Sequence, residues 1–363
     1  MATPTRVLVV DDSVVIRRIL GQILDGEPDL EPLRPAANGK IGLARIEEDK
    51  PDIVILDVEM PVLDGLQTLA QIRKDWPSLP VIMFSTLTER GATTTLDALS
   101  LGASDYLAKP TAAVAVMSSS AEQIRTDLCA KIRALCPANQ PMPLASARPR
   151  SRPAAAPASA GPIEIVTVGV STGGPNALAE FLPQFPADFP VPIVIVQHMP
   201  PMFTRLLAER LDRDCKLSVR EGEAGQKIGP GEIWLAPGDK HMVIDKRLDG
   251  ARIDLNLDPP ECSCRPAADV LFRSVAQAYG GASLGVVLTG MGQDGLRGSE
   301  AMTDAGASII AQDEASCVVW GMPAAVTNAG LATEVLPLAQ IAGAVCRRVE
   351  RSRDASKTPA GGR

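Results

Sequence analysis

Short apolar runs alternate with amphipathic stretches through the first third of the chain. The runs "RVLVV", "DIVIL" and "PVIMF" are rich in Val and Ile and are bounded by polar turns, and a shorter run, "ASDYLAKP", follows them. Between these runs, residues 14–24 and 65–75 repeat apolar positions with the period of a helix. Strands that alternate with helices predict a parallel sheet that helices cover on both faces.

The same alternation returns in the second half of the chain with new segments. The runs "IEIVTVGV", "VPIVIVQ", "EIWLAP", "LGVVLTG" and "ASIIAQ" have strand character, and helices are predicted to begin at "GPNALAEFL", "ADVLFRSVAQAY" and "GLRGSEAMTDA". The halves share this architecture without a sequence repeat. We therefore predict an α/β chain with two doubly wound parallel-sheet domains, whose chemistry gathers at the carboxyl ends of the strands.

A segment of different composition separates the two halves. From Cys136 to Pro162 the sequence is crowded with Pro, Ala, Ser and Arg and has no hydrophobic period. Such a segment buries too little apolar surface to offset its ordering entropy, which predicts a flexible linker. The predicted organisation is a first domain over 1–125, a linker over 126–162, a second domain over 163–350 and a flexible tail over 351–363.

Composition and charge narrow the possible functions. The formal net charge of −7 argues against nucleic acid as the main partner. No apolar run approaches the roughly 20 residues that a membrane-spanning helix needs, and the N-terminus lacks the apolar stretch of a signal peptide. We therefore expect a cytoplasmic protein without membrane insertion. The seven cysteines contain no CxxC pair and are expected to be reduced, and "CSC" at 262–264 is too small a ligand set to predict a metal site.

Polar side chains stand at four strand ends of the first domain. Asp11 and Asp12 follow one strand, Asp57 the next, Ser85 a third, and Lys109 closes a fourth. Crowded carboxylates at one sheet edge require a positive partner, and Mg²⁺ prefers such oxygen ligands while leaving positions open for phosphate. Capping of the following helix remains the alternative for Asp11 and Asp12 taken singly. Together, these residues indicate a pocket that accepts a phosphoryl group.

A candidate nucleophile lies in "VGVSTGGP", where Ser171 is the serine of a G-x-S-x-G turn between a strand and a helix. The chain has two histidines. His198 ends an apolar strand at the same predicted edge and is the candidate base, whereas His241 is interpreted as a surface or turn histidine. Asp294 in "LTGMGQDG" is the candidate acid that orients the base. The order Ser, His, Asp differs from that of α/β-hydrolases, so a lipase-type fold is not predicted.

The loop around Asp294 permits a second interpretation. Gly290, Gly292 and Gly295 spell G-x-G-x-x-G, and Asp313 follows the next strand, which imitates a dinucleotide-binding fingerprint. However, the motif comes late in its domain and leaves "STGGP" and "QHMP" without a role. Nucleotide binding is therefore the weaker interpretation.

The first domain resembles the response-regulator receivers, which have a flavodoxin-like fold. The resemblance rests on "VDDS", "LDVEMPVLDG", Ser85, Tyr106 and the "KP" that begins at Lys109. It implies that a histidine kinase phosphorylates Asp57, and that Ser85, Lys109 and Tyr106 sense the phosphoryl group. It also implies a set of Mg²⁺ ligands: Asp11, Asp12, Asp57 and the backbone carbonyl of Glu59.

The second domain resembles the Rossmann-like catalytic domain of the receiver-regulated protein-glutamate methylesterases of bacterial chemotaxis. The matching segments are "GVSTGGP", "QHMP", "APGDKHM", "RPAADVLF", "LTGMGQDG" and "GMPAA". The resemblance implies a triad of Ser171, His198 and Asp294, an oxyanion held by backbone N–H groups near Thr172 and Met291, and no cofactor in this domain. The segment "ECSCRP" departs from the family pattern and is interpreted as a surface turn at the substrate-facing rim.

The two resemblances together imply a phosphorylation-activated hydrolase of a two-component chemotaxis system. Its substrates would be glutamate methyl esters on chemoreceptors, with methanol as the product, and it would also deamidate receptor glutamines. We expect the unphosphorylated receiver to cover the Ser171 cleft. A receiver joined to a catalytically idle binding domain is the alternative, and the presence of all three triad residues argues against it.

Overall fold

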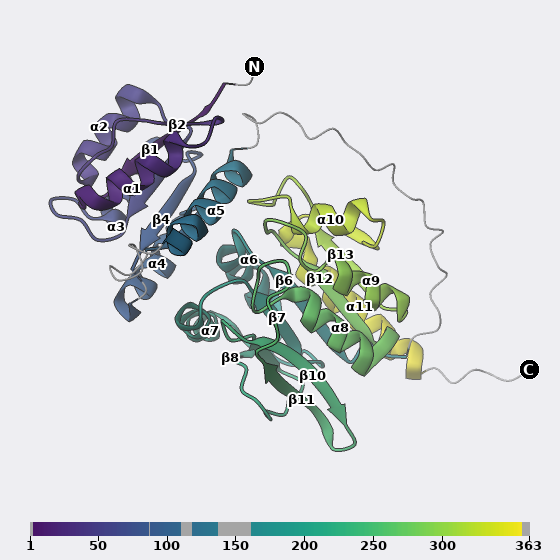
Figure 1. Ribbon diagram of the computed structural model, residues 1–363. Helices are drawn as coiled ribbons and strands as arrows, with labels where there is room; N and C mark the ends of the chain where they lie inside the picture. The colour runs from purple at the N-terminus through teal and green to yellow at the C-terminus, as the bar shows by residue number, and fades with distance from the viewer. Residues whose placement is uncertain (1–2, 87, 110–117, 137–160, 358–363) are drawn as a thin grey trace, which may run out of the picture. The chain divides into compact units, whose positions relative to one another are not determined.

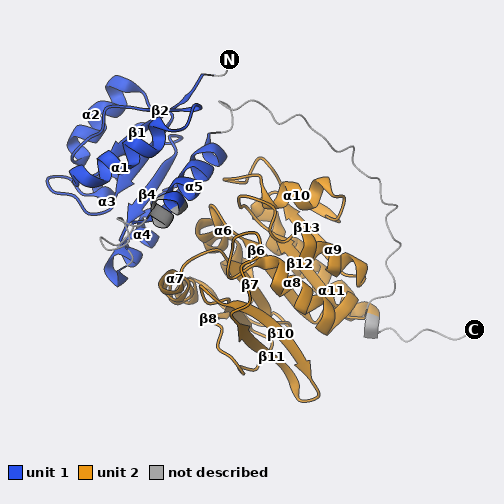
Figure 2. Ribbon diagram, in the orientation of Figure 1, with its two compact units in different colours: residues 1–146 blue, residues 147–363 orange. Residues whose placement is uncertain are grey.

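The computed structural model describes residues 3–86, 88–109, 118–136 and 161–357. The chain divides into two compact units, residues 1–146 and residues 147–363 (Figure 2). Most of the predicted linker lies outside the described residues. Within the described ranges, no helix is long and apolar enough to cross a membrane.

The first unit is a five-stranded parallel sheet with the strand order β2-β1-β3-β4-β5 (Figure 1). This is the order of a flavodoxin-like fold, as the sequence predicts. Its strands are β1 (Thr5–Val10), β2 (Leu30–Pro32), β3 (Ile53–Asp57), β4 (Val81–Ser85) and β5 (Asp105–Ala108). Its helices are α1 (Val14–Asp25), α2 (Gly39–Asp49), α3 (Gly65–Asp75), α4 (Glu89–Ser100) and α5 (Ser118–Leu135).

Helices cover both faces of this sheet because alternate strand residues point to opposite sides. Val7 and Val9 of β1 belong to a buried cluster with residues of α1 and α5. Val10 faces the other way, and a Cβ atom added at Gly42 of α2 would lie 3.0 Å from its side chain. The two faces together bury the apolar runs from which the strands were predicted.

Helix α5 continues ten residues past position 125, where the sequence analysis ends the first domain. Leu128 and Ile132 are fully buried in the cluster with α1, and Arg133 forms ion pairs with Glu27 and Asp29. The second half of α5 therefore belongs to the receiver unit. The hydrophobic pattern did not predict this half of the helix, because many of its residues are polar. Its ion pairs could not be predicted either, since they join positions about a hundred residues apart.

The second unit has a seven-stranded parallel sheet with the order β14-β13-β12-β6-β7-β9-β8, and a separate antiparallel pair, β10 and β11 (Figure 1). Its strands are β6 (Ile165–Val170), β7 (Ile193–Gln197), β8 (Ser218–Glu221), β9 (Glu232–Leu235), β10 (His241–Arg247), β11 (Gly250–Asn256), β12 (Ser283–Val287), β13 (Ser308–Gln312) and β14 (Glu334–Leu336). Its helices are α6 (Gly174–Phe181), α7 (Pro201–Asp214), α8 (Ala268–Tyr279), α9 (Leu296–Asp304), α10 (Met322–Asn328) and α11 (Leu338–Lys357), with short 3₁₀ turns η2 (Leu182–Gln184) and η3 (Gly280–Ala282).

The last two residues of the central strand β6 show how helices cover both faces of this sheet. A Cβ atom at Gly169 would lie 2.8 Å from the Cβ of Ala268 in α8, so α8 packs closely on one face. Val170 points to the opposite face, where a Cβ at Gly174 of α6 would lie 2.8 Å from it. The predicted doubly wound parallel sheet is therefore confirmed in this unit as well.

Helix α11 runs to Lys357, past residue 350 where the sequence analysis ends the second domain. Its last turns contact the body of the unit. Ser352 accepts a hydrogen bond from the backbone N–H of Ile163 at 2.9 Å, and the Arg353 guanidinium donates to the carbonyl of Pro190 at 3.3 Å. These contacts order a stretch that its polar composition had suggested to be a flexible tail.

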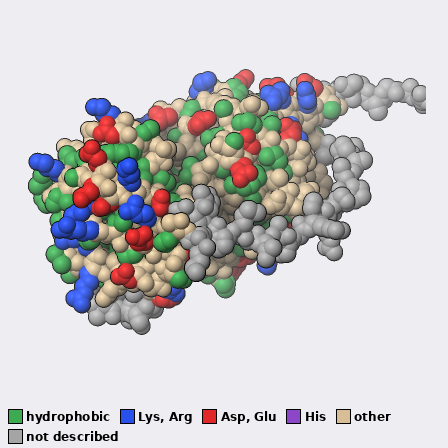
Figure 3. Space-filling model, turned by 90° about the horizontal axis from the view of Figure 1, so that it is seen from above, with side chains coloured by type: hydrophobic (Ala, Val, Ile, Leu, Met, Phe, Trp, Pro, Cys, Tyr) green, Lys and Arg blue, Asp and Glu red, His purple; other side chains and the backbone are tan. Residues whose placement is uncertain are grey.

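Charged side chains of both signs are interspersed on the face that Figure 3 shows. Lys and Arg side chains do not form a continuous field on that face, and the whole chain has a net charge of −7. Such a surface offers little attraction to a polyanion.

Candidate active site

Ser171 and His198 occupy equivalent places at the carboxyl edge of the second sheet. Strands β6 and β7 are parallel neighbours, and Val170 is in register with Gln197, the last residue of β7. Ser171 and His198 are the next residues of the two strands, and the backbone N–H of His198 donates to the carbonyl of Val170 at 3.3 Å. The strand pairing thus places the candidate nucleophile and the candidate base side by side.

Asp294 reaches the same edge from the loop after β12. Strand β12 pairs with β6 on the side away from β7, so the strand order changes direction at β6. Ligands bind at such switch points in parallel sheets. The Nε2 atom of His198 lies 2.7 Å from the Oδ2 atom of Asp294. The three residues therefore meet at the position that the fold favours for chemistry.

The carboxylate of Asp294 is held by the N-terminus of α8. Its Oδ2 accepts the backbone N–H of Ala268 at 2.6 Å, and its Oδ1 accepts those of Asp269 and Gly295 at 2.9 Å each. Burial raises the pKa of Asp294, but the contact with His198 and these N–H groups outweigh it, and the pKa lies below its ordinary value. Asp294 is therefore ionised at neutral pH and accepts only.

This arrangement assigns the two nitrogens of the His198 ring. An ionised Asp294 accepts, so in the neutral form of the ring Nε2 carries the proton and Nδ1 has the lone pair. Burial lowers the pKa of His198, but hydrogen bonds with Asp294 and with the thiol of Cys264 outweigh burial and raise it above its ordinary value. Nδ1 is thus the nitrogen available to receive a proton from Ser171.

Hydrogen bonds hold the backbone of Ser171 at both its N–H and its carbonyl. Its N–H donates to the carbonyl of Thr289 at 3.0 Å, and its carbonyl accepts from Gly174 N at 2.8 Å and from the Gln197 side chain at 3.0 Å. Gly173 begins α6 with φ of +77°, a conformation that favours glycine. A Cβ at Gly174 would lie 1.8 Å from the Gln197 side-chain oxygen. The glycines of the motif thus serve a tight turn.

The predicted oxyanion donors, Thr172 and Met291, lie on the two loops beside Ser171. Thr172 follows Ser171 directly and is buried. Met291 follows Gly290, and a Cβ at Gly290 would lie only 2.8 Å from the Cβ of Ser171. The N–H of Ser171 already donates to the carbonyl of Thr289. The backbone N–H groups of Thr172 and Met291 are therefore the candidate oxyanion donors, because these residues directly follow Ser171 and Gly290.

The "ECSCRP" segment is a tight turn that reaches the site. Glu261 and Cys264 exchange backbone hydrogen bonds of 3.1 and 2.8 Å. The sulfur of Cys264 lies 3.5 Å from the Nδ1 atom of His198. The interpretation as a surface turn holds for the exposed Cys262, but Cys264 is half-buried and touches the candidate base. No sequence pattern indicated this contact, because it joins residues 66 positions apart.

His241 is not the surface or turn histidine that the sequence suggested. It is fully buried at the start of β10. Its Nδ1 accepts the backbone N–H of Ala267 at 3.3 Å, and its Nε2 lies 3.2 Å from the carbonyl of Pro259. The imidazole therefore has a structural role, because it satisfies backbone groups that precede α8. The residues around His241 indicated a turn followed by a strand, but they did not indicate that the start of this strand is buried.

Cys262 lies beside two carboxylates, but they are already engaged. One ligand atom each of Cys262, Asp269 and Asp294 lies within 4.8 Å of the others. Asp294 accepts three backbone N–H groups, and Asp269 accepts the N–H of Gly298 at 2.6 Å. These carboxylates cap α8 and α9, which accounts for the cluster without a metal.

The predicted phosphoryl site lies at the carboxyl edge of the receiver sheet. Oxygens of Asp11, Asp12 and Asp57 lie within 4.8 Å of one another. The Lys109 ammonium lies 2.8 Å from Asp11 Oδ2 and 2.7 Å from Asp57 Oδ2. Burial raises the pKa of Asp57 to about 6; Lys109 opposes this rise, and the charge of Asp11 adds to it. The site is thus short of positive charge, as a divalent cation site is.

The other predicted receiver residues differ in their placement. The hydroxyl of Ser85 donates toward the carbonyls of Gly91 and Thr86, at 3.1 and 3.3 Å, at the end of β4. Tyr106 is buried in β5, and burial raises its pKa well above the ordinary value. Glu59 donates its backbone N–H to Asp57 at 3.2 Å, and its exposed side chain lies 3.5 Å from Arg90. Ser85 is the last residue of β4, the strand that pairs with β3, and Glu59 follows Asp57 by two residues.

Comparison with known proteins gives the chain a family. Residues 166–345 match the CheB methylesterase family, and residues 7–119 match the response regulator receiver domain. A protein-glutamate methylesterase/protein-glutamine glutaminase of Trichodesmium erythraeum is 49% identical over 95% of this chain and 99% of the relative. This chain belongs to that family. A relative with the same name from a Nocardioides species is 46% identical over 98% of each chain.

A solved structure supports the assignment of the second unit to this methylesterase family. The CheB methylesterase catalytic domain of Thermotoga maritima is 40% identical, with a TM-score of 0.50. The match covers 52% of this chain and 98% of that domain. The parallel-sheet fold with helices on both faces is therefore shared with a solved family member.

Thr289 is a site residue of this methylesterase-family chain that sequence reasoning missed. Its buried hydroxyl donates to the carbonyl of Thr172 at 2.9 Å and accepts the N–H of Val319 at 3.0 Å. Its own N–H donates to the side chain of Gln312 at 2.8 Å. Thr289 therefore ties the Ser171 turn to the loops after β12 and β13. Its position within "LTG" was the available signal, but its partners lie up to 117 residues away.

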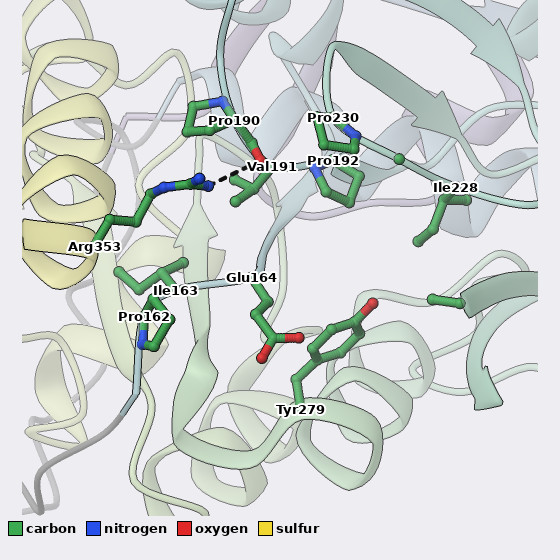
Figure 4. A pocket seen from close by; sticks show the side chains of 12 residues that line it. Pro162, Ile163, Glu164, Pro190, Val191, Pro192, Ile228, Pro230, Tyr279 and Arg353 are labelled. Carbon is green, nitrogen blue, oxygen red and sulfur yellow. Dashed lines mark hydrogen bonds between the residues drawn. The ribbon is translucent and has the colours of Figure 1, made fainter. Parts of the chain in front are cut away.

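A separate cavity of about 460 Å³ lies at the opposite edge of the same sheet (Figure 4). Its lining includes Pro162, Pro190 and Pro230, which lie close before β6, β7 and β9. Figure 4 shows Glu164 beside the Tyr279 ring, and Arg353 hydrogen-bonded to Pro190. Because this is the amino edge of the strands, the cavity does not serve the Ser171 site.

Proposed function

We propose that this chain is a receiver-regulated hydrolase that removes methyl groups from glutamate esters of chemoreceptors and also deamidates receptor glutamines. The observation that carries the proposal is the position of His198. Its Nε2 faces the fixed carboxylate of Asp294, and its residue stands beside Ser171 at the switch point of the sheet. The two relatives of this chain described above carry the name of both activities.

In the proposed first step, Nδ1 of His198 takes the hydroxyl proton of Ser171. The serine oxygen attacks the carbonyl carbon of the glutamyl ester, and the carbonyl electrons move to its oxygen. Backbone N–H groups of Thr172 and Met291 would bind this oxyanion, a kind of donation worth about 3 to 4 kcal/mol in serine hydrolases. Asp294 stabilises the imidazolium that forms.

In the proposed second step, the imidazolium of His198 gives its proton to the leaving group. The ester releases methanol, and a glutamine side chain releases ammonia by the same route. Water then attacks the acyl-enzyme while His198 accepts its proton, and the serine oxygen leaves. Both substrates therefore give a free glutamate, and Ser171 and His198 return to their starting state.

The receiver would control this reaction through Asp57, the proposed acceptor of a phosphoryl group from a histidine kinase. The carboxylates of Asp11, Asp12 and Asp57, with the backbone carbonyl of Glu59, fit Mg²⁺, whose charge would neutralise phosphoryl oxygens when bound. The ammonium of Lys109, now paired with two carboxylates, would turn to the added charge of about −2. The side chains of Ser85 and Tyr106 would also sense the phosphoryl group on Asp57.

The test is methanol release from methyl-labelled receptor membranes with the full chain. Rates are compared with and without a small-molecule phosphodonor and Mg²⁺, in wild type, Ser171→Ala and Asp57→Asn. We expect Ser171→Ala to lose at least about a thousandfold in turnover. We expect Asp57→Asn to keep the basal rate and lose the rise with phosphodonor.

The matched control is Ser78→Ala, the same change at an exposed receiver position. Near-normal release by Ser171→Ala would exclude Ser171 as the nucleophile. No release by wild type under any condition, with membranes that a related enzyme demethylates, would reduce the second domain to a binding module.

A further inference from the structure

The turn between β11 and α8 presents two thiols beside the candidate active site. Cys262 and Ser263 have positive φ angles of +50° and +62°. Residues that carry a side chain disfavour this left-handed conformation, so surrounding contacts must hold it. An ion pair between Glu261 and Arg273 anchors one end of the turn, and Arg265 pairs with Asp239 at 2.7 Å at the other.

This turn places Cys264 at the reactive nitrogen of His198. The sulfur lies 3.5 Å from Nδ1, while Nε2 is occupied by Asp294. Nδ1 is the atom that must receive the proton of Ser171. The thiol therefore stands in the space where the base, the nucleophile and the ester have to meet.

A thiol paired with an imidazole has a characteristic reactivity. Transfer of its proton to Nδ1 leaves a thiolate, which is the form that attacks disulfides, with the imidazolium beside it. Cys264 is half-buried rather than enclosed, so small reagents can reach it. The Cys264–His198 pair thus has both requirements of a reactive cysteine: a nearby base and access.

The other cysteines lack this setting. Burial raises the pKa of Cys136, Cys215 and Cys317 to about 12, which keeps them as unreactive thiols at neutral pH. Burial also raises the pKa of Cys262, although that residue is exposed at the surface of the turn. Cys262 is therefore a matched control for Cys264, on the same turn but outside the His198 contact.

We propose that Cys264 is a modification site for small disulfides, and that a group attached to its sulfur stops the hydrolase reaction at His198. The thiolate attacks one sulfur of the disulfide, its S–S bond breaks, and a mixed disulfide forms on Cys264. The leaving thiolate takes the proton from His198 and departs as a thiol. Excess small thiol reverses the exchange.

The attached group acts by position. It lies on the Nδ1 side of His198, so it excludes the ester carbonyl from the space between His198 and Ser171. Hydrolysis needs the reacting atoms within about 3.5 Å of one another, and an inserted side group prevents this approach. Inhibition should therefore appear as loss of turnover that a thiol restores.

The activity test rests on the proposed function and uses the full chain in chelator-containing buffer without phosphodonor. Wild type, Cys264→Ser and Cys262→Ser are treated with the disulfide of 2-mercaptoethanol, and each methanol-release rate is compared with that variant's own untreated rate. We expect the methanol-release rates of wild type and Cys262→Ser to fall at least about tenfold. The loss should be proportional to the fraction of Cys264 that peptide mass spectrometry finds as the mixed disulfide. Excess 2-mercaptoethanol should restore both, and Cys264→Ser should keep its rate.

A second readout does not depend on the hydrolase activity. Mass spectrometry follows the rate of mixed-disulfide formation at Cys264 in wild type and in His198→Gln. We expect this rate to fall about tenfold without the imidazole, while the rate at Cys262 is unchanged. If the proposed function is wrong, wild type releases no methanol before treatment, but mixed-disulfide formation at Cys264 is still slower in His198→Gln than in wild type. Equal rates at Cys264 in both proteins, or equal inhibition of Cys264→Ser and wild type, would overturn the proposal.

Discussion

The Oδ2 atom of Asp294 lies 2.7 Å from Nε2 of His198 and, on its other side, accepts the N–H of Ala268 at 2.6 Å. The same carboxylate thus joins the candidate base to the N-terminus of α8. The positive end of a helix dipole favours a negative charge at this position. Burial raises the pKa of Asp294, but the contact with His198 and, after it, the N–H groups of α8 lower that pKa and keep the carboxylate ionised. The ionised carboxylate determines which nitrogen of the neutral His198 ring carries the proton.

We predict that Asp294→Asn lowers kcat by about a thousandfold or more, with a small change in KM. Asn has one oxygen and one donor nitrogen, whereas every partner of Asp294 is a donor: the three backbone N–H groups and His198. If the amide nitrogen turns to His198, Nε2 must accept, and the proton moves to Nδ1. The base then cannot take the proton of Ser171.

Methanol release under saturating and limiting substrate separates the two kinetic constants for this variant. Asp258→Asn, the same change on an exposed residue between β11 and α8, should retain the wild-type rate. A kcat within tenfold of wild type for Asp294→Asn would mean that the carboxylate does not set the tautomer.

The raised pKa of His198 predicts a pH dependence of the rate. The imidazole acts as a base only when neutral. A pKa above the ordinary value of about 6.5 leaves a smaller neutral fraction at pH 7, so kcat/KM should increase as pH rises beyond neutrality. The measurement is kcat/KM for methanol release from about pH 6 to 9, with the Ser171→Ala rate subtracted as the ester background.

The receiver carries a second titrating group, so the pH series is repeated in Asp57→Asn. Burial raises the pKa of Asp57 to about 6, and this variant removes that ionisation. The rise with pH should be the same in both proteins if His198 causes it. A rate that is already flat from pH 6 upward would contradict the raised pKa of His198.

The sheet edges of this chain were predictable because they follow from local patterns. Asp57, Ser171 and His198 each come directly after a Val- and Ile-rich run. In a parallel sheet, the ends of such runs share an edge, so an apolar period and the residue after it suffice to place these side chains. Their chemical roles remain predictions.

Other features were not predictable, because they depend on pairings between distant segments. The contact of Cys264 with His198, the buried place of His241 and the hub at Thr289 arise when β10, α8 and β12 pack together. No period in the sequence reports such contacts. The second half of α5 was missed for the same reason, since its ion pairs reach back to the turn before β2.

Gln197, like Thr289, is a residue whose importance only the geometry of the site shows. The residue is 2% exposed, and its side-chain amide nitrogen donates to the carbonyl of Ser171 at 3.0 Å and to that of His198 at 3.4 Å. It therefore connects the backbones of the candidate nucleophile and base. We predict that Gln197→Met lowers kcat about tenfold, and that Gln197→Glu lowers it further, because a carboxylate would face two carbonyl oxygens.

The order of these two variants distinguishes positioning from packing. Met and Glu are both close to Gln in size, so a packing effect would favour neither over the other by much. Gln184→Met, an exposed position on η2, is the matched control and should behave as wild type. Thermal unfolding of each variant shows whether the loss is one of fold. Equal turnover for Gln197→Glu and wild type would contradict the role.

Lys109 leads to a prediction about the receiver. Its ammonium lies 2.8 Å from Asp11 and 2.7 Å from Asp57, on two of the carboxylates proposed to bind Mg²⁺. A cation at this distance repels a second cation that enters the same pocket. We predict that Lys109→Met binds Mg²⁺ about tenfold more tightly, while methanol release no longer rises with phosphodonor.

In Lys109→Met, Mg²⁺ binding should become tighter while the response to phosphodonor is lost, and this combination separates a charge effect from damage to the fold. A receiver that has lost its structure would bind Mg²⁺ more weakly, whereas removal of a competing charge strengthens binding. Calorimetric titration with Mg²⁺ measures the affinity, and Lys74→Met, on the exposed face of α3, should leave both the affinity and the response unchanged. Weaker Mg²⁺ binding by a folded Lys109→Met would contradict the competition, because the carboxylates would then need Lys109 in place to form the site.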